Sequence, residues 1–591
     1  MPESRPANPD APAGTLRWDV QWQGGRFTAP DGTLAPPRWG THPDLAAAHR
    51  ALDEWAESNQ LREKLPALFG WTPWWYLRFI LAHDVLFRAL PAARALAEVR
   101  EQYGVPGRIR LHHPPAPWWP QLVALVFPEA NVDHVRAEAA RRLERMQRIA
   151  SRMVRALVTR PRLRRLAARP ADRPRVVVLC QSRYWDGARD THLHGVIDAL
   201  DAEGYAPVVL VQSHSGNAVG LRGVRTRPRS HLFCDIVYWR AMRKGLGRER
   251  TGWELPGAPL MLEGLDFAPL VRDFIAKRLA ALTWEQGVFT WLVPELLAKI
   301  GAQAVVLLDE NGAEHFFHMG CVRAGVPTVA VQHGCIHGHH LHYIYPHGVA
   351  PEDVPLARKT CVFGAHYADL LTQHSVYPSG AVEVTGSPQV DAGQAVEVET
   401  AAREFRRRVL PEGCDTLLLL TSQDLLHALV GPRFLEALRH APRRFFAVVR
   451  PHPREFDARH WDRYIADSGT QGRVAVLDAP PLDVMLAACD AHLSASSTVL
   501  GEAVLYQRPS IVVGGRAVGD WMGVLEAGVA VDLDDFPSLE AAVAHWLDAA
   551  PEQQAEFAAR REAYAARHFH VGDGPAPQRI AGVVRSVIEG P

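Results

Sequence analysis

The chain has 591 residues and a mass of 65.4 kDa, which is too long for one ordinary domain and predicts two or three. Its 65 Lys and Arg balance its 65 Asp and Glu, so the net charge exerts no long-range attraction on nucleic acid, and we expect no nucleic-acid partner. A hydrophobic content of 47% and a charged content of 22% are typical of folded globular proteins and exclude a largely disordered chain.

The cysteine pattern and the N-terminal residues predict a cytoplasmic protein. The 7 cysteines are scattered without a close Cys-x-x-Cys pair, which argues against a zinc or redox motif and favours a reducing compartment. Residues 1–14 lack the basic and then apolar pattern of a signal peptide. No stretch approaches the roughly 18 apolar residues that a membrane-spanning helix needs.

Residues 1–135 predict a mainly helical N-terminal domain, because apolar side chains recur there at helical spacing. Large rings cluster within this region at Trp71, Trp74, Trp75 and Tyr76. Core aromatics of a helical domain are one interpretation of this cluster. A sugar-stacking platform or a groove for a partner is the other.

Residues 136–173 predict an Arg-rich helix followed by a linker. Apolar residues at helical spacing alternate with arginines, so a chain of zero net charge concentrates its cations here. The apolar stripe consists of Leu143, Met146, Ile149, Met153 and Leu157. One interpretation is a solvated helix face. The other is peripheral contact of residues 136–169 with an anionic membrane surface, at the inner membrane face, or with an anionic polymer.

From Pro174 onward, short β-branched runs alternate with helical patterns, which is typical of parallel βαβ units. We therefore predict an α/β fold with two tandem Rossmann-like, doubly wound domains over residues 174–390 and 416–591, joined by a linker over 391–415. The predicted strands are 175–180, 207–212, 304–308 and 327–331, then 416–420, 445–449, 474–477, 491–493 and 510–513. Ligands of such domains bind just beyond the carboxyl ends of the strands.

Three strand ends of the second α/β domain carry polar residues that suit an anionic ligand. A histidine between prolines beside an arginine, and hydroxyl residues before a helix, can donate hydrogen bonds to a phosphate. These residues are Ser422, Gln423, Arg450, His452, Pro453, Ser496, Ser497, Thr498 and Glu502. A helix cap without a ligand is the alternative for the serines.

The first α/β domain offers candidates for chemistry at its own strand ends. We expect Asp309, Glu310 and His333 to be catalytic, since paired carboxylates can supply a general base for an acceptor hydroxyl. A helix cap is the alternative for Asp309 and Glu310. Candidate acceptor-binding residues are Gln181, Arg183, Asp186 and Gln332. Five histidines between 333 and 342 could suggest a metal, but a loop broken by glycines does not define converging ligands, so we expect none.

Over about residues 174–570 the sequence resembles GT-B glycosyltransferases of bacterial surface and capsular polysaccharide biosynthesis. The resemblance is carried by Gln332-His333-Gly334, Thr385-Gly386-Ser387-Pro388 with Asp391, Arg450-Pro451-His452-Pro453, and Ser496-Ser497 with Glu502-Ala503. The His-Pro and Ser-Ser pairs are similar to motifs by which sialic acid and Kdo transferases hold the phosphate of a CMP-sugar. The resemblance implies that His452, Ser496 and Ser497 contact donor phosphate and that Glu502 lies near the ribose or base. Asn311 departs from the acidic-acidic-Gly motif of the sialyltransferases, which the sequence Asp309-Glu310-Asn311-Gly312 otherwise resembles.

The expected activity is transfer of a sugar from a nucleotide-activated donor, with a CMP-sugar favoured, to a glycan or lipid-linked glycan acceptor. The nucleotide-sugar is a substrate, no cofactor is expected and no metal is required. Three alternatives stay open: an enzyme like UDP-N-acetylglucosamine 2-epimerase, a CDP-glycerol glycerophosphotransferase, and a non-catalytic glycan-binding module. Gly386 and Pro388 end a strand and predict a hinge that lets the two domains close on substrate.

Overall fold

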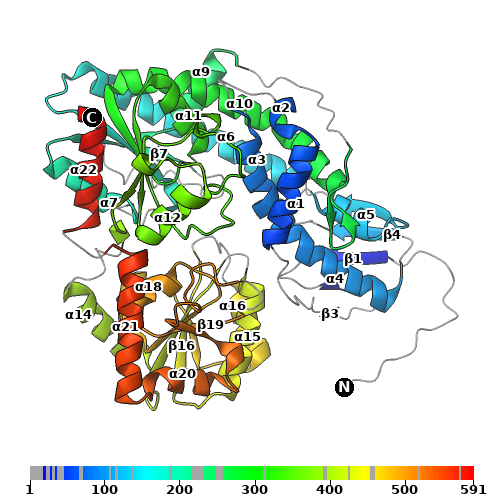
Figure 1. The fold of residues 1–591 in the computed structure, drawn as a ribbon. Coiled ribbons are helices and arrows are strands. Elements are labelled where there is room, and N and C mark those ends of the chain that lie inside the picture. Colours follow the sequence, from blue (N-terminus) through cyan, green and yellow to red (C-terminus); the bar gives the residue numbers. More distant parts are fainter. Residues whose placement is uncertain are drawn as a thin grey trace. The chain divides into compact units, whose positions relative to one another are not determined.

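The structure is a computed structural model, and its elements fall into two compact units (Figure 1). It describes residues 17–21, 27–28, 34–35, 45–65, 71–105, 108–112, 118–135, 138–184, 190–213, 231–246, 257–310, 314–389, 396–423, 426–452, 459–514, 519–570 and 574–590. The first unit comprises Met1–Gln60, Ile80–Glu144 and Gly252–Arg278, and the second comprises Leu61–Phe79, Arg145–Thr251 and Leu279–Pro591.

The first unit contains a small parallel sheet in the order β1-β4-β5, which the prediction of a mainly helical region did not include. Its strands are β1 (Arg17–Gln21), β4 (Arg108–His112) and β5 (Asn131–Val135). Its main helices are α1 (Leu45–Ser58), α4 (Phe87–Tyr103) and α5 (Trp119–Val126). Two short antiparallel pairs complete it: β2 (Phe27–Thr28) with β3 (Leu34–Ala35), and β9 (Met261–Leu262) with β10 (Leu265–Asp266).

Two long helices contribute residues to both units. They are α6 (Glu138–Ala168) and α10 (Ala268–Ile300). The second unit begins with two short helices, α2 (Leu61–Lys64) and α3 (Trp74–Ile80), of which α3 carries Trp74, Trp75 and Tyr76 of the predicted aromatic cluster.

A seven-stranded parallel sheet forms the first α/β domain of the second unit, in the order β14-β13-β12-β11-β6-β7-β8. Its strands are β6 (Arg175–Gln181), β7 (Ala206–Gln212), β8 (Leu232–Phe233), β11 (Ala302–Leu307), β12 (Thr328–Val331), β13 (Lys359–Val362) and β14 (Val382–Val384). Its connecting helices are α7 (His194–Ala202), α9 (Asp235–Arg243), α11 (His315–Ala324) and α12 (Ala365–His374). Every residue of β6 is buried, as expected of a central parallel strand covered on both faces.

A six-stranded parallel sheet forms the second α/β domain, in the order β17-β16-β15-β18-β19-β20. Its strands are β15 (Thr416–Thr421), β16 (Phe445–Arg450), β17 (Val474–Val476), β18 (Ala491–Ser494), β19 (Ser510–Val512) and β20 (Ala530–Asp532). Its helices are α14 (Val396–Val409), α15 (His427–His440), α16 (Arg459–Ser468), α17 (Leu482–Ala488), α18 (Val499–Leu505), α20 (Leu539–Leu547) and α21 (Pro551–His568). Figure 1 shows α15 and α16 on one side of this sheet and α18 and α21 on the other.

Both sheets have the strand order of a doubly wound Rossmann fold. When the strands of each sheet are numbered along the chain, both run 3-2-1-4-5-6, and the first sheet adds a seventh strand. The order reverses between β6 and β11 in the first sheet and between β15 and β18 in the second. The prediction of an α/β fold with two Rossmann-like domains is confirmed. The reversal points are where such sheets bind ligands, beyond the carboxyl ends of the strands.

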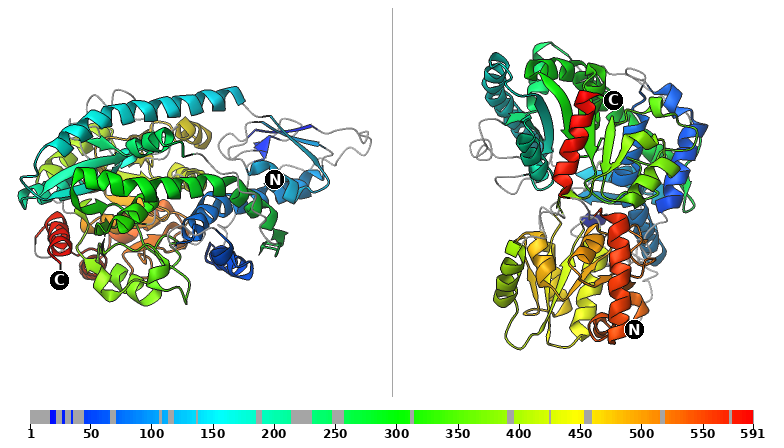
Figure 2. Two further views of the ribbon diagram at one scale, coloured as in Figure 1. Left: turned by 90° about the horizontal axis from the view of Figure 1, so that it is seen from above. Right: turned by 60° about the vertical axis from the view of Figure 1, so that its left-hand side comes forward.

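The last helix belongs to the first sheet, whereas the sequence predicts it in the second domain, over residues 416–591. Helix α22 (Ala576–Glu589) packs Ile580, Ala581 and Val584 into one buried cluster with β6, β7 and α7 (Figure 2). The end of α21 packs against Gly364 of the first domain. A Cβ added at Gly364 would lie 2.4 Å from the backbone oxygen of Arg567. Only glycine allows this close approach.

The predicted linker at 391–415 contains α14, whose Ala402 and Phe405 lie in the core of the second sheet with Leu417 and Leu419. Asp391 lies outside the described residues, and the hinge at Gly386 and Pro388 stays a prediction.

Among the described residues, no helix has both the length and the apolar character to cross a membrane.

Candidate functional site

The carboxyl end of β11 places Asp309 at the reversal point of the first sheet. Because Leu307 pairs with Leu179 of β6 and with Ala330 of β12, Asp309 lies level with the ends of both neighbouring strands. Its side chain is buried, and its φ angle is 103°, a conformation that costs energy for any residue except glycine.

Two histidines of the loop after β12 approach the Asp309 carboxylate. Its Oδ2 lies 3.5 Å from Nδ1 of His342 and 3.7 Å from Nδ1 of His333. Burial opposes ionisation of Asp309, but the hydrogen bond and charge of His342 and the charge of His333 outweigh it and hold the pKa of the carboxyl below its usual value. An ionised Asp309 can therefore orient an imidazole and stabilise its protonated form.

Glu310 faces a different set of partners, although it is the next residue. Its carboxylate accepts hydrogen bonds from the hydroxyls of Tyr377 and Thr360 and from the backbone N–H of Ala357. Burial is the main cause that raises the pKa of Glu310 to about 7, and the charge of Asp309 adds to it. Glu310 thus links the end of β11 to β13, to the segment before β13 and to the segment after α12.

Gln332 holds the start of the histidine loop, which is the loop after β12 that carries His333 and His342. Its side-chain Oε1 accepts a hydrogen bond from the backbone N–H of Phe363 at 2.8 Å, and its Nε2 donates to the carbonyl of Gly334 at 2.8 Å. With both ends of its amide occupied, Gln332 positions the loop that carries His333.

Helix α3 covers the same loop, so the buried aromatic cluster has a structural role here. Trp74 and Trp75 are buried, which agrees with the interpretation as core aromatics. The ring of Phe79 lies against that of His342, with 3.4 Å between centroids. Arg78 is fully buried and donates to the carbonyls of Leu341, at 3.0 Å, and Ile344.

Two of the predicted acceptor residues, Gln181 and Arg183, lie at the carboxyl end of β6. Gln181 is buried and donates to the carboxylate of Glu314. Arg183 lies in a short 3₁₀ turn whose backbone is described and whose side chain is not. Asp186 lies outside the described residues.

Sequence reasoning did not assign a role to Tyr184 or Asp190, which also lie at this edge. The ring of Tyr184 packs against that of His192, with 4.2 Å between centroids, and lies 6.4 Å from that of His333. Asp190 accepts hydrogen bonds from the backbone N–H groups of His192 and Leu193. The sequence feature that could have identified them is an aromatic and an acidic residue soon after the end of a predicted strand.

Polar atoms without a protein partner mark this edge as a place for a polar ligand. Among the described residues, Oε1 of Gln181 and Nε2 of His342 are buried and accept or donate no hydrogen bond. Buried polar atoms are normally paired with protein, water or a ligand.

The reversal point of the second sheet brings Gln423 and Ser496 together. The pairing of Leu420 with Leu493 sets residues 423 and 496 at the same level, three positions beyond that pair. Gln423 Nε2 donates to the carbonyl of Ser496 at 2.9 Å, and the hydroxyl of Ser496 donates to Gln423 Oε1 at 3.2 Å. The hydroxyl of Ser422, beside them, is buried and has no hydrogen-bond partner among the described residues.

Ser497, Thr498 and Glu502 surround the start of α18. The hydroxyl of Ser497 accepts a hydrogen bond from the backbone N–H of Val499, the first residue of the helix, at 3.3 Å. Thr498 precedes the first residue of the helix. Burial raises the pKa of Glu502 to about 7, and a hydrogen bond from Thr498 partly offsets this effect.

Arg450 ends β16 and His452 follows it, on the other side of β15 from the serines. The Arg450 guanidinium donates to the carbonyl of Pro480 at 2.7 Å, so it supports the loop after β17. His452 is partly exposed at the same edge. Strand β15 therefore lies between the strands that carry His452 and Ser496. At the usual strand spacing these two strands are about 10 Å apart. Pro453 lies outside the described residues.

The loops beyond β12 and β19 also touch. The ring of His337 stacks on that of Trp521, with 4.7 Å between centroids, and Sγ of Cys335 lies 3.5 Å from the carbonyl oxygen of Trp521. Within the described part of the chain, no group of three or more His, Cys, Asp or Glu side chains has an arrangement that could hold a metal ion.

Comparisons with known proteins give matches in structure alone. No protein-family model matches the chain. No curated protein matches it either. A UDP-GlcNAc 2-epimerase from Neisseria meningitidis is 11% identical with a TM-score of 0.40, and the alignment covers 70% of this chain and 99% of that one. MnaA of S. aureus is 13% identical with a TM-score of 0.43, and the alignment covers 70% of this chain and 96% of that one. A glycosyltransferase from Rickettsia africae is 10% identical with a TM-score of 0.42, and the alignment covers 71% of this chain and 100% of that one.

Proposed function

We propose that this chain is a glycosyltransferase that uses a nucleotide-activated sugar, with the donor at the second sheet and the acceptor at the first. The observation that carries the proposal is the gathering of polar side chains at the reversal points of two Rossmann sheets in one unit. Asp309 and the histidines lie at one point, and Ser422, Gln423 and Ser496 lie at the other.

On the donor side, hydroxyl and amide groups would bind the phosphate of the nucleotide. The unpartnered hydroxyl of Ser422 and the paired Gln423 and Ser496 offer donors in a buried setting, where a hydrogen bond to an anion is strong. His452 would reach the phosphate from the neighbouring strand end. The resemblance of His452-Pro453 and Ser496-Ser497 to sialic acid and Kdo transferases favours a CMP-sugar donor and a surface or capsular glycan acceptor.

On the acceptor side, we assign the role of general base to His333, with Asp309 as its positioning residue. The Asp309 carboxylate at 3.7 Å from Nδ1 would hold the ring so that Nε2 takes the proton of the attacking hydroxyl. Glu310 is occupied by Tyr377, Thr360 and Ala357 and would act only by supporting Asp309. Hydrogen bonds to the leaving phosphate would stabilise the charge that develops there, so the scheme requires no metal.

Nucleotide binding and His452→Ala together test this proposal. A thermal unfolding panel with CMP, CDP, UDP and GDP should show stabilisation by one nucleotide, because a ligand at 100 times its Kd adds about 2.7 kcal/mol to the free energy of unfolding. His452→Ala should lose this stabilisation and the transfer activity while remaining folded. His440→Ala, on an exposed helix position, is the matched control. A fully active His452→Ala enzyme would remove the donor site proposed here.

Three further assays distinguish the alternatives. Interconversion of UDP-N-acetylglucosamine without any acceptor would indicate an epimerase. Consumption of CDP-glycerol would indicate a glycerophosphotransferase. Stabilisation by glycan together with no response to any nucleotide would indicate a binding module.

A further inference from the structure

Helix α6 carries a stripe of exposed apolar side chains. Met146, Ile149, Met153 and Leu157 are 60%, 46%, 38% and 50% exposed. Their spacing of three, four and four residues places them on one face of the helix, over about 16 Å of its length. Large apolar side chains that are exposed together, rather than singly, mark an interaction surface.

The opposite face of α6 fixes the helix to the second unit. Arg155 is buried and forms an ion pair with Asp235, with 2.9 Å between Nε and Oδ2. The hydroxyl of Thr159 accepts a hydrogen bond from the backbone N–H of Phe233 at 3.0 Å, and Leu163 is buried on the same side. The helix is therefore anchored through one face, and the stripe points away from that anchor.

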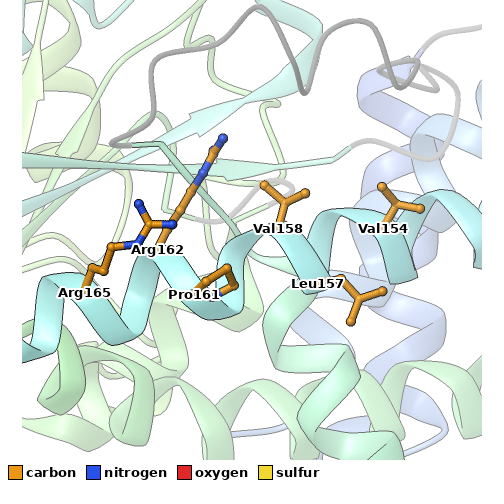
Figure 3. Close-up of a pocket in the computed structure, with 6 residues that line it drawn as sticks. All are labelled: Val154, Leu157, Val158, Pro161, Arg162 and Arg165. Atoms are coloured by element: carbon orange, nitrogen blue, oxygen red, sulfur yellow. The ribbon is translucent and has the colours of Figure 1, made fainter.

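An open groove runs beside the stripe (Figure 3). It has a volume of about 530 Å³ and lies on α6. Its lining residues are Val154, Leu157, Val158, Pro161, Arg162 and Arg165. The figure shows the apolar members along the helix and the two arginines at its C-terminal part. The groove thus widens the apolar surface and ends in positive charge.

The charge around the stripe has one sign. The helical spacing of the stripe continues through Arg160 and Arg164, so the same face turns from apolar to basic. Arg164, Arg165 and Arg169 are exposed. Between Glu144 and Asp172 the sequence contains no acidic residue, whereas the whole chain has a net charge of zero.

We propose that the α6 stripe and its arginines bind the surface of an anionic lipid membrane. Apolar side chains of an amphipathic helix insert at the boundary between headgroups and acyl chains, and adjacent arginines pair with lipid phosphates. A helix partner from another protein would be expected to meet charges of both signs on its flanks. After Glu144 the charged side chains of α6 are all cationic, which is the complement of an anionic surface. The inference is independent of the reaction that the chain catalyses.

Sedimentation of the full chain with lipid vesicles tests the proposal. The native protein should pellet with vesicles of phosphatidylcholine and phosphatidylglycerol, should pellet weakly with phosphatidylcholine alone, and should be released by added salt. The double variant Met153→Glu with Leu157→Glu should lower the bound fraction about tenfold or more, because it removes two apolar side chains that would insert into the membrane. The double variant Arg160→Glu with Arg164→Glu should lower it by a similar factor.

Matched controls separate the surface from general charge effects. Met242→Glu changes a methionine of similar exposure on α9, and Arg407→Glu with Arg408→Glu changes two exposed arginines on α14. Both controls should pellet like the native chain, and thermal unfolding should show that every variant is folded. Absence of pelleting by the native chain, or equal loss in the controls, would overturn the proposal. So would self-association in analytical ultracentrifugation that the stripe variant abolishes without any vesicle binding, since the stripe would then be a contact between two copies.

Discussion

At the scale of single residues, the backbone of Asp309 stands apart from the rest of the described chain. Three other described non-glycine residues have positive φ, namely Gln60, Glu263 and Gln507, and their angles lie between 52° and 56° in the ordinary left-handed region. The angle of 103° at Asp309 lies outside that region. Strain of this kind persists where the surroundings hold it, and it is concentrated at functional sites. The two histidines at its carboxylate are the surroundings that could require it.

Asp309→Asn tests the pairing with His333 at little cost to the backbone, because asparagine tolerates positive φ better than most residues. Loss of the carboxylate should lower kcat for transfer by about 10²- to 10⁴-fold, the range of general-base contributions, while KM for the donor changes little. The pH dependence of kcat should change as well, since the imidazole loses the negative charge beside it. Steady-state kinetics over a range of pH measure both effects. An unchanged pH profile would argue against a positioning role.

Glu310 should make the stability of the protein depend on pH. Its carboxyl has an ordinary pKa of 4.5 and a folded pKa of about 7, raised mainly by burial. As pH rises from about 4.5 to about 7, the unfolded chain releases the proton first, so the free energy of unfolding falls. The fall from this one group is about 3 kcal/mol at 1.36 kcal/mol per pKa unit.

In Glu310→Gln this part of the pH dependence should disappear. Urea unfolding at pH 5 and pH 8 measures it as the difference between the free energies of unfolding at the two pH values. Glu412→Gln, at an exposed position, serves as the control and should keep the native pH dependence. Equal pH dependence in the native chain and in Glu310→Gln would show that the carboxyl is not buried as described.

At the scale of elements, the histidine loop is held by α3 through Arg78. The guanidinium lies 5.2 Å from the ring centres of Trp75 and Tyr345, and its hydrogen bonds end on carbonyls that flank His342 and Tyr343. A segment before residue 80 therefore shapes the site that the first sheet forms more than two hundred residues later. Both belong to the same compact unit.

Arg78→Met keeps the apolar stem but leaves the carbonyls of Leu341 and Ile344 without their donor. Burying two unpaired carbonyls should lower the free energy of unfolding by about 2–5 kcal/mol. Chemical denaturation measures this loss, and Arg88→Met at an exposed position should change stability by no more than about 0.5 kcal/mol. A loss as small in Arg78→Met as in the control would show that α3 does not hold the loop.

The strands of both sheets could be predicted because they are continuous apolar runs between turn signals, as Arg175–Gln181 shows. Strand β13, with the sequence Lys-Thr-Cys-Val, and the three residues of β20 are too short or too mixed to give that signal. The sequence also located candidate residues at strand ends, but not the direction of their side chains. Arg450 faces Pro480 and Glu310 faces Tyr377 because of tertiary partners that are distant in the sequence.

At the scale of the whole molecule, α22 joins the end of the chain to the first sheet. Its Ile580 is fully buried in the cluster with Val176, Val178 and Leu200, about four hundred residues earlier. Near it, Arg579 Nε donates to the carbonyl of Thr385 at 2.8 Å, and the backbone N–H of His570 donates to the carbonyl of Phe363 at 2.7 Å. A sequence pattern cannot show which sheet a terminal amphipathic helix covers, because both sheets offer apolar faces to it.

Ile580→Ala should therefore destabilise the first α/β domain and not the second. Removing a fully buried isoleucine side chain lowers the free energy of unfolding by about 2–5 kcal/mol, through lost burial and the cavity that remains. Hydrogen exchange followed by mass spectrometry should show faster exchange in β6, β7 and β11 and unchanged exchange in β15 and β16. Ser586→Ala, on the exposed side of α22, should leave both sheets unchanged. Faster exchange confined to β15 and β16 would assign the helix to the second sheet, as the sequence alone had suggested.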